Sequence, residues 1–231
     1  MKIMTFNTQH CLDYLNQKID FQVMADAINQ LDADIVALNE MFDNSKHEEY
    51  DKQTEKLSKL TTLPYFFFAK AIFDVYGDYG NGLLSRYPIK SAEVIMIPDP
   101  SPRKYNGFYE TRCLLKAVLE NGLTVLATHF GLNPDEHENA VNTVIKHITD
   151  TKCILMGDFN VSPDNPVLAP IKAKMKDTGD LFNSTKLSWP SDKPTIKIDY
   201  IFVSPDIEVV SADIPSLIAS DHRPHIAEIK I

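Results

Sequence analysis

Short apolar runs in this chain end in, or lead into, polar side chains that can ligate a metal or exchange a proton. Residues 153–156 are apolar and run into Gly157, Asp158, Phe159 and Asn160. A carboxylate next to a carboxamide suits phosphoryl transfer, because the carboxylate can take a proton from water and the amide can hold water or a phosphoryl oxygen. Taken alone, this tetrapeptide is more typical of an ordinary turn than of a catalytic site.

The same arrangement recurs along the chain, and the recurrence points to one site. Buried strands rarely carry unpaired ionisable groups, and open sheets gather ligands at the ends of their strands. We therefore expect these polar side chains to meet at one edge of a sheet. They are Asn7, Glu40 after Asn39, His129, Asp158 with Asn160, Asp199, and Asp221 with His222.

The composition is that of a globular protein with one large core. Hydrophobic residues make up 44% of the 231 residues and charged residues 24%, and the polar strand ends span the chain, so we expect one domain covering residues 1–231. Cys11, Cys113 and Cys153 form no CxxC pair, which argues against a zinc site or a disulfide framework and favours a reducing compartment. No apolar run is long enough for a transmembrane helix. Since Asn7 follows Met1 so closely, we expect no signal peptide and a cytoplasmic location.

The net charge of −9, from 23 basic and 32 acidic residues, bears on the substrate. Binding of duplex DNA relies on phosphate neutralisation by Lys and Arg, which an acidic chain does not favour. The clusters at residues 172–176 and 103–104 are typical of a solvated surface. A nuclease that relies on a metal and a local basic patch stays open as an alternative. The sequence does not indicate an oligomeric state.

The order of the expected elements indicates a mixed α and β fold. Asp20 can cap a helix that runs to residue 31. A strand that ends at Glu40 is expected to follow this helix. Two further helices are expected, one at residues 46–60 and one from Pro134 onward. Asn121 and Gly122 predict a hairpin turn. The remaining expected strands cover residues 65–69, 82–85, 92–97, 112–119 and 123–128.

From residue 2 to residue 231, the ordered set of polar strand ends resembles the endonuclease/exonuclease/phosphatase superfamily. Supporting sequence motifs lie at residues 81–89, 128–130 and 198–202. The resemblance implies a deoxyribonuclease I-like fold, in which two packed mixed sheets are flanked by helices in a four-layer α/β/β/α sandwich. It also implies a hydrolase that acts on phosphoric ester bonds with the help of Mg²⁺ or Mn²⁺.

The resemblance and the chemistry agree on the role of each residue. Glu40 is expected to be the principal metal ligand, with Asn7 and Asp221 completing that position, because a hard cation prefers oxygen donors. Asp158 is expected to deprotonate the attacking water. Asn160 is expected to fix that water or a phosphoryl oxygen, His129 and His222 to donate hydrogen bonds to the phosphoryl group, and Asp199 to hold His222.

Two segments are candidates for choosing the substrate, and each is also typical of a plain surface loop. Residues 73–80 are rich in aromatic residues and glycine, and residues 99–111 carry Arg103 and Lys104. Glu40 is followed by Met41, Phe42 and Asp43 rather than by the Thr-Lys of repair endonucleases, which argues against cleavage at abasic sites.

The favoured function is metal-dependent hydrolysis of a small or lipid-linked phosphodiester or phosphomonoester by in-line attack of water. A nuclease acting on DNA or RNA is the alternative. A binding protein without catalysis would have lost a site residue, and none is missing.

Overall fold

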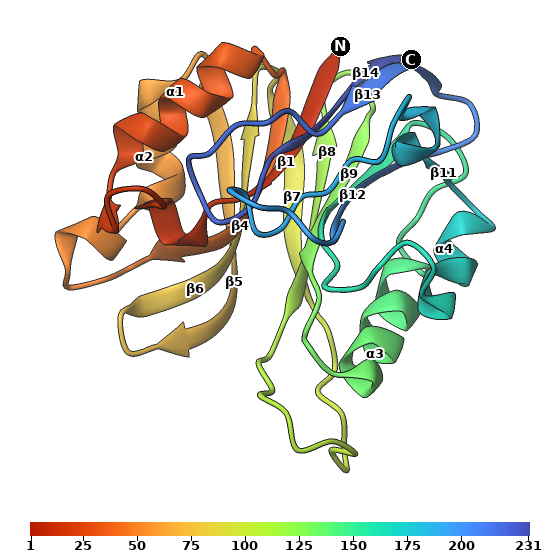
Figure 1. The fold of residues 1–231 in the computed structure, drawn as a ribbon, viewed down its shortest axis with the longest axis horizontal. Coiled ribbons are helices and arrows are strands. Elements are labelled where there is room, and N and C mark those ends of the chain that lie inside the picture. Colours follow the sequence, from red (N-terminus) through yellow and green to blue (C-terminus); the bar gives the residue numbers. More distant parts are fainter.

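Two six-stranded sheets pack face to face in the computed structural model, which describes residues 1–231 (Figure 1). The first sheet has the order β13-β14-β1-β4-β6-β5, with β1 at Lys2–Asn7, β4 at Ile35–Asp43, β5 at Tyr65–Asp74, β6 at Gly77–Ser85, β13 at Glu208–Asp213 and β14 at His225–Lys230. The second has the order β11-β12-β10-β9-β8-β7, with β7 at Ile89–Met96, β8 at Cys113–Leu119, β9 at Thr124–His129, β10 at Cys153–Asp158, β11 at Lys176–Asp177 and β12 at Asp199–Val203. A separate ribbon pairs β2 (Leu12–Asp13) with β3 (Lys18–Ile19).

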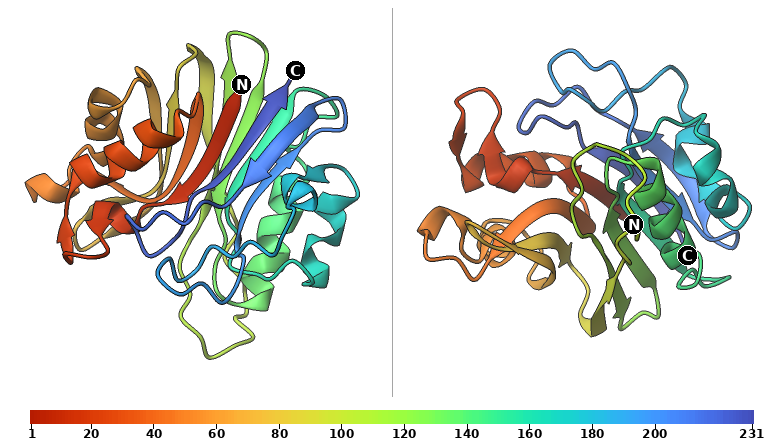
Figure 2. Two further views of the ribbon diagram at one scale, coloured as in Figure 1. Left: turned by 45° about the horizontal axis from the view of Figure 1, so that its top comes forward. Right: turned by 90° about the horizontal axis from the view of Figure 1, so that it is seen from below.

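Helices cover the outer face of each sheet, which makes the predicted α/β/β/α sandwich (Figures 1 and 2). On the first sheet lie α1 (Phe21–Leu31) and α2 (Gln53–Leu60), and on the second lie α3 (Pro134–Val144) and α4 (Ala169–Lys172). Short 3₁₀ helices occur at Gln9–Cys11, Glu48–Tyr50, Pro166–Leu168 and Thr178–Leu181. No helix is long and apolar enough to cross a membrane.

Strand β10 shows how the apolar runs produce these layers. Successive side chains of a strand point to opposite faces of the sheet. Ile154 and Met156 accordingly pack in the core between the two sheets, whereas Cys153 and Leu155 pack in the core under α3 and α4. A run that is apolar at every position is therefore what a strand buried on both faces requires.

The strand directions bring the predicted polar residues to one edge. Each sheet has a parallel pair at its centre, β1 with β4 and β9 with β10, and each pair is connected through a helix, α1 or α3. The antiparallel strands β12 and β14 begin at the edge where the parallel strands end, since Asp158 pairs with Asp199 and Thr5 with His225. Strand ends and strand starts thus meet at the same place.

Most of the predicted elements are present, but two predictions are wrong. The Asp20 carboxylate accepts the N–H groups of Gln22 and Val23 and so caps α1, as expected. The helix expected at residues 46–60 is interrupted, because Lys52 has a left-handed φ of 50° between the 3₁₀ turn at Glu48–Tyr50 and α2. Residues 73–80 are not a loop: they form the ends of β5 and β6 and the tight turn between them.

The predicted hairpin turn and the predicted loop at residues 99–111 agree with the structure. Gly122, with a φ of 82°, provides the turn between β8 and β9. Residues 99–111 are a loop without regular structure, and this loop extends from the lower edge of the molecule in Figure 1.

A polar bridge crosses the apolar interface between the sheets. The Asn39 side chain of β4 is fully buried, and its Nδ2 donates to the carbonyl oxygen of Thr128 at 2.9 Å and to Asn81 Oδ1 at 2.8 Å. Its Oδ1 accepts the N–H of Asp158 at 3.0 Å. Asn81 in turn donates to the carbonyl oxygen of Cys113 at 3.1 Å. Every polar group of the Asn39 amide is used, so the two sheets are held in one relative position.

We expect Asn39→Ala to lower the free energy of unfolding by roughly 2–4 kcal/mol, because the N–H of Asp158 and the Asn81 side chain lose partners in the interior. Urea unfolding followed by circular dichroism measures this. The control is Asn29→Ala, which removes an exposed hydrogen bond to the Leu60 carbonyl and should change stability by about 0.5 kcal/mol or less. Equal losses in the two variants would contradict a special role for the bridge.

Candidate active site

The eight predicted site residues gather at the shared edge of the two sheets. Six of them line one cavity of about 500 Å³, and the other two, Asn7 and Asp199, are fully buried and hydrogen-bonded to residues that line it. The six are Glu40, His129, Asp158, Asn160, Asp221 and His222.

Asp158 lies at the centre of this group. Its Oδ2 accepts the Asn7 amide at 3.1 Å and lies 3.5 Å from His129 Nε2 and 3.6 Å from His222 Nε2. Its Oδ1 accepts the backbone N–H of Asn160 at 2.9 Å. Burial raises the pKa of the Asp158 carboxyl to about 7, against the opposing charge of His222. A carboxylate with such a pKa can take a proton near neutral pH.

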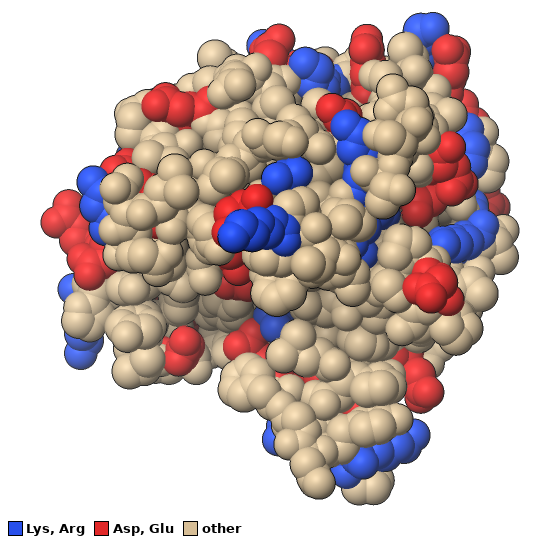
Figure 3. Space-filling model, in the orientation of Figure 1, with Lys and Arg blue, Asp and Glu red and all other residues tan.

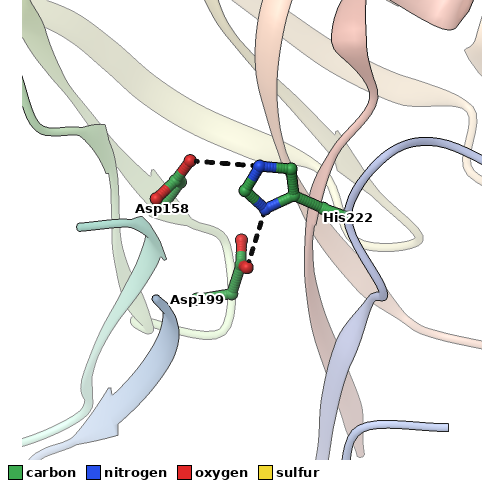
Figure 4. Close-up of side chains that lie close together, drawn as sticks. All are labelled: Asp158, Asp199 and His222. Carbon is green, nitrogen blue, oxygen red and sulfur yellow. Dashed lines mark hydrogen bonds and ion pairs between the residues drawn. The ribbon is translucent and has the colours of Figure 1, made fainter. Parts of the chain in front are cut away.

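His222 lies between two carboxylates (Figure 4). Its Nδ1 donates to Asp199 Oδ2 at 2.9 Å, while Nε2 faces Asp158. Burial on its own would lower the pKa of His222, but the charges of Asp199 and Asp158 outweigh it and raise this pKa to about 10. These two carboxylates favour the imidazolium form of the ring, and its Nε2 is directed toward Asp158.

His129 is the neutral counterpart of His222. Burial, together with the charges of Arg112 and His222, holds the pKa of His129 well below its usual value. The Arg112 guanidinium can only donate, and it lies 3.0 Å from His129 Nδ1. His129 Nε2 lies 3.1 Å from the Asn160 amide nitrogen, which also donates to the carbonyl oxygen of Phe130, and 3.5 Å from Asp158 Oδ2.

Glu40 and Asn160 reach the site through unusual backbone conformations. The strand expected to end at Glu40 continues to Asp43, and the pairing of β4 with β6 shifts register between Leu38 and Met41. Glu40 lies in this bulge with a φ of 62°, and Asn160 has a φ of 52°. Bulges redirect side chains, and positive φ in residues other than glycine is often found at functional sites.

The structure adds Arg112, to which the sequence assigned no role. Arg112 lies just before β8, is largely buried, pairs with Glu110 and is the only Lys or Arg that lines the cavity. A sequence signal existed, since Arg112 directly precedes an apolar run, as Asp199 does at the start of β12.

The oxygen donors fit a hard divalent cation. Glu40 Oε1 accepts the Asn7 amide at 2.9 Å; burial raises the pKa of Glu40, and the charge of Asp221 raises it further. Carboxylates that line one cavity in this way suit a hard divalent cation. Asp158, Asp199 and His222 also lie close enough to hold an ion. However, both ring nitrogens of His222 already face carboxylates, and an imidazolium has no lone pair for a metal.

Comparisons with known proteins agree with this geometry. The uncharacterized protein YbhP of Escherichia coli strain K12 is 25% identical over 253 aligned residues, which cover 100% of this chain and 96% of YbhP. The structure of an endonuclease/exonuclease/phosphatase from Beutenbergia cavernae covers this whole chain with 71% of its own length, at a TM-score of 0.78 and 19% identity. A mannosyl-6-phosphatase of Bacteroides thetaiotaomicron matches over the full length of both chains, at a TM-score of 0.76 and 17% identity.

The family model described as the endonuclease/exonuclease/phosphatase family matches residues 4–222, which include all eight of the predicted site residues. The chain belongs to the endonuclease/exonuclease/phosphatase family.

Proposed function

We propose that this protein is a divalent-metal-dependent hydrolase that cleaves a P–O bond of a small or lipid-linked phosphodiester or phosphomonoester by in-line attack of water. The observation that carries the proposal is the buried Asp158 carboxylate, which lies between His129 and His222 in the cavity that Glu40 and Asp221 also line. Members of this family hydrolyse phosphoester bonds, and a structural relative is named as a mannosyl-6-phosphatase. The free, buried cysteines suit the expected cytoplasmic location.

Glu40 would hold Mg²⁺ or Mn²⁺, with Asn7 and Asp221 at the same position. Asn7 already donates to both Glu40 and Asp158, so it fixes the distance between the metal position and the base. The bound ion would neutralise charge on the phosphoryl oxygens.

Asp158 would take the proton of the attacking water, and the backbone N–H of Asn160 fixes the orientation of its carboxylate. His222, held by Asp199, would donate from Nε2 to a phosphoryl oxygen as negative charge develops there. His129 would donate a second hydrogen bond as a neutral ring. One charged and one neutral donor stabilise a spread negative charge without repelling each other strongly.

A nuclease remains the second candidate and is less favoured. Four carboxylates line the cavity, those of Glu40, Glu110, Asp158 and Asp221, and the only Lys or Arg is Arg112. On the face in Figure 3, basic and acidic side chains are interspersed and form no continuous basic stripe. Such a surface gives little of the counterion release on which binding of long nucleic acids depends.

Metal dependence is testable through Glu40. EDTA should abolish turnover of bis-p-nitrophenyl phosphate or another accepted ester, and Mg²⁺ or Mn²⁺ should restore it. Glu40→Gln should raise the metal concentration for half-maximal activity by roughly tenfold or more, because a ligand charge is lost. The control is Glu120→Gln, at an exposed position, which should leave the metal concentration for half-maximal activity unchanged. Undiminished turnover in EDTA would contradict the proposed metal dependence.

The roles of Asp158 and His222 are testable by kinetics. Asp158→Asn and His222→Ala should each lower kcat by roughly 10²-fold or more, and the double variant should lose less than the product of the two, because the residues act together. The exposed His47→Ala should retain full kcat. If both site variants kept more than about a third of kcat, the assigned roles would be wrong.

A further inference from the structure

Three exposed apolar side chains surround the cavity that holds Asp158 and His222. Phe108 is 67% exposed, Leu132 55% and Trp189 40%, and all three line this cavity. They come from three separate segments: the loop before β8, the turn after β9, and the segment before β12. Large apolar side chains that gather in the open beside polar groups mark a binding surface.

The segments that carry Phe108 and Leu132 are anchored to the start of α3. The Asn133 amide donates to the carbonyl oxygen of Phe108 at 2.7 Å, and the hydroxyl of Tyr109 donates to Asp135 at 2.9 Å. The N–H of Leu132 donates to Glu136 Oε2 at 3.2 Å. These hydrogen bonds hold both apolar side chains on a fixed support.

Trp189 is held by a small hairpin of its own. Its carbonyl oxygen accepts the N–H of Thr195 at 2.8 Å, and its N–H donates to the carbonyl oxygen of Ile196 at 3.1 Å. Ile196 and Ile198 line the same cavity as Trp189 and add to its apolar wall. The wall is therefore built from ordered backbone, which lowers the entropy cost of binding against it.

The charges of the cavity limit what else the substrate can carry. Arg112 is the only Lys or Arg in the lining, and it is already engaged by Glu110 and His129. A metal at Glu40 and Asp221 would serve the reacting phosphoryl group alone. A second phosphoryl group on the substrate would find carboxylates and apolar side chains, with no free cation.

We propose that the substrate is an ester of a single phosphoryl group with a neutral, largely apolar alcohol, whose apolar part packs against Phe108, Leu132 and Trp189. This inference rests on the proposed function and makes its substrate class specific. It favours a ring-bearing or lipid-like alcohol over sugar polyphosphates and polynucleotides.

A series of primary-alcohol esters tests the substrate class, because the P–O bonds then have similar intrinsic reactivity. The series is methyl, benzyl and octyl phosphate, with 1,4-butanediol bisphosphate as the member that carries two phosphoryl groups. Benzyl or octyl phosphate should exceed methyl phosphate in kcat/KM by about tenfold or more, as expected for partial burial of a ring or chain. The bisphosphate should be no better than methyl phosphate. A methyl ester that is turned over as well as the others, or a preferred bisphosphate, would overturn the inference.

Alanine substitutions test the apolar wall formed by Phe108, Leu132 and Trp189. Phe108→Ala and Trp189→Ala should each lower the benzyl-to-methyl ratio of kcat/KM by roughly fivefold, because part of the packing is lost. Phe73→Ala is the control, since Phe73 is 69% exposed but does not line the cavity, and it should leave the ratio unchanged. An unchanged ratio in both wall variants contradicts the inference even if turnover is high.

Trp189 is the only tryptophan of the chain and provides a measurement that needs no turnover. Benzylphosphonate, whose P–C bond is not hydrolysed, should change the tryptophan emission and bind with a lower Kd than methylphosphonate. Phe108→Ala should remove this difference, and Phe73→Ala should not. If neither these monoesters nor the diester bis-p-nitrophenyl phosphate is turned over, the proposed function fails. The phosphonate Kd values still decide this inference, because equal values would overturn it.

Discussion

The Asn39 bridge is the contact on which the geometry of the site depends. Apolar side chains hold the two sheets together, but apolar contacts are not directional and allow several relative positions. The Asn39 amide accepts the N–H of Asp158 and donates to the carbonyl oxygen of Thr128, so β4 is fixed against both β9 and β10. As a result Asn7 of β1 lies within 3.1 Å of the Asp158 carboxylate.

Because the relative position of the two sheets is fixed, the site can hold buried charged side chains at fixed distances from one another. Burying Asp158 and Asp199 is unfavourable by itself, and the imidazolium of His222 between them offsets part of that cost. The positive φ values of Glu40 and Asn160 add local strain. Strands β9 and β10 also approach each other closely next to the site. Gly157 allows this approach, because a Cβ on Gly157 would lie 1.8 Å from the carbonyl oxygen of Thr128. These features make unfavourable contributions to the free energy of folding, and the burial of apolar side chains in the sandwich must offset them.

The sequence predicted the residues of the site better than their geometry. Polar residues at strand ends could be recognised because the apolar runs are local, and strands that share an edge bring their ends together. The bulge at Glu40 could not be recognised, since it depends on the pairing of β4 with β6. The Asn39 bridge depends on how one sheet lies on the other, which no local pattern encodes. The left-handed Lys52 interrupts a segment with a helical pattern, and its N–H donates to Asp43 Oδ1 at 3.3 Å, a contact that the pattern could not predict.

The two halves of the chain contribute different chemistry to the site. The β1-α1-β4 unit carries Asn7 and Glu40, whereas the β9-α3-β10 unit carries His129 and Asp158. Neither unit holds a complete site, so activity requires the packed sandwich. Phe108 and Trp189 of the apolar wall, in contrast, lie outside both units, and Leu132 lies in the turn between β9 and α3. These segments are anchored to the start of α3 and to the hairpin at Trp189, so changes in them would alter the proposed apolar wall while the buried residues of the candidate site remain in place.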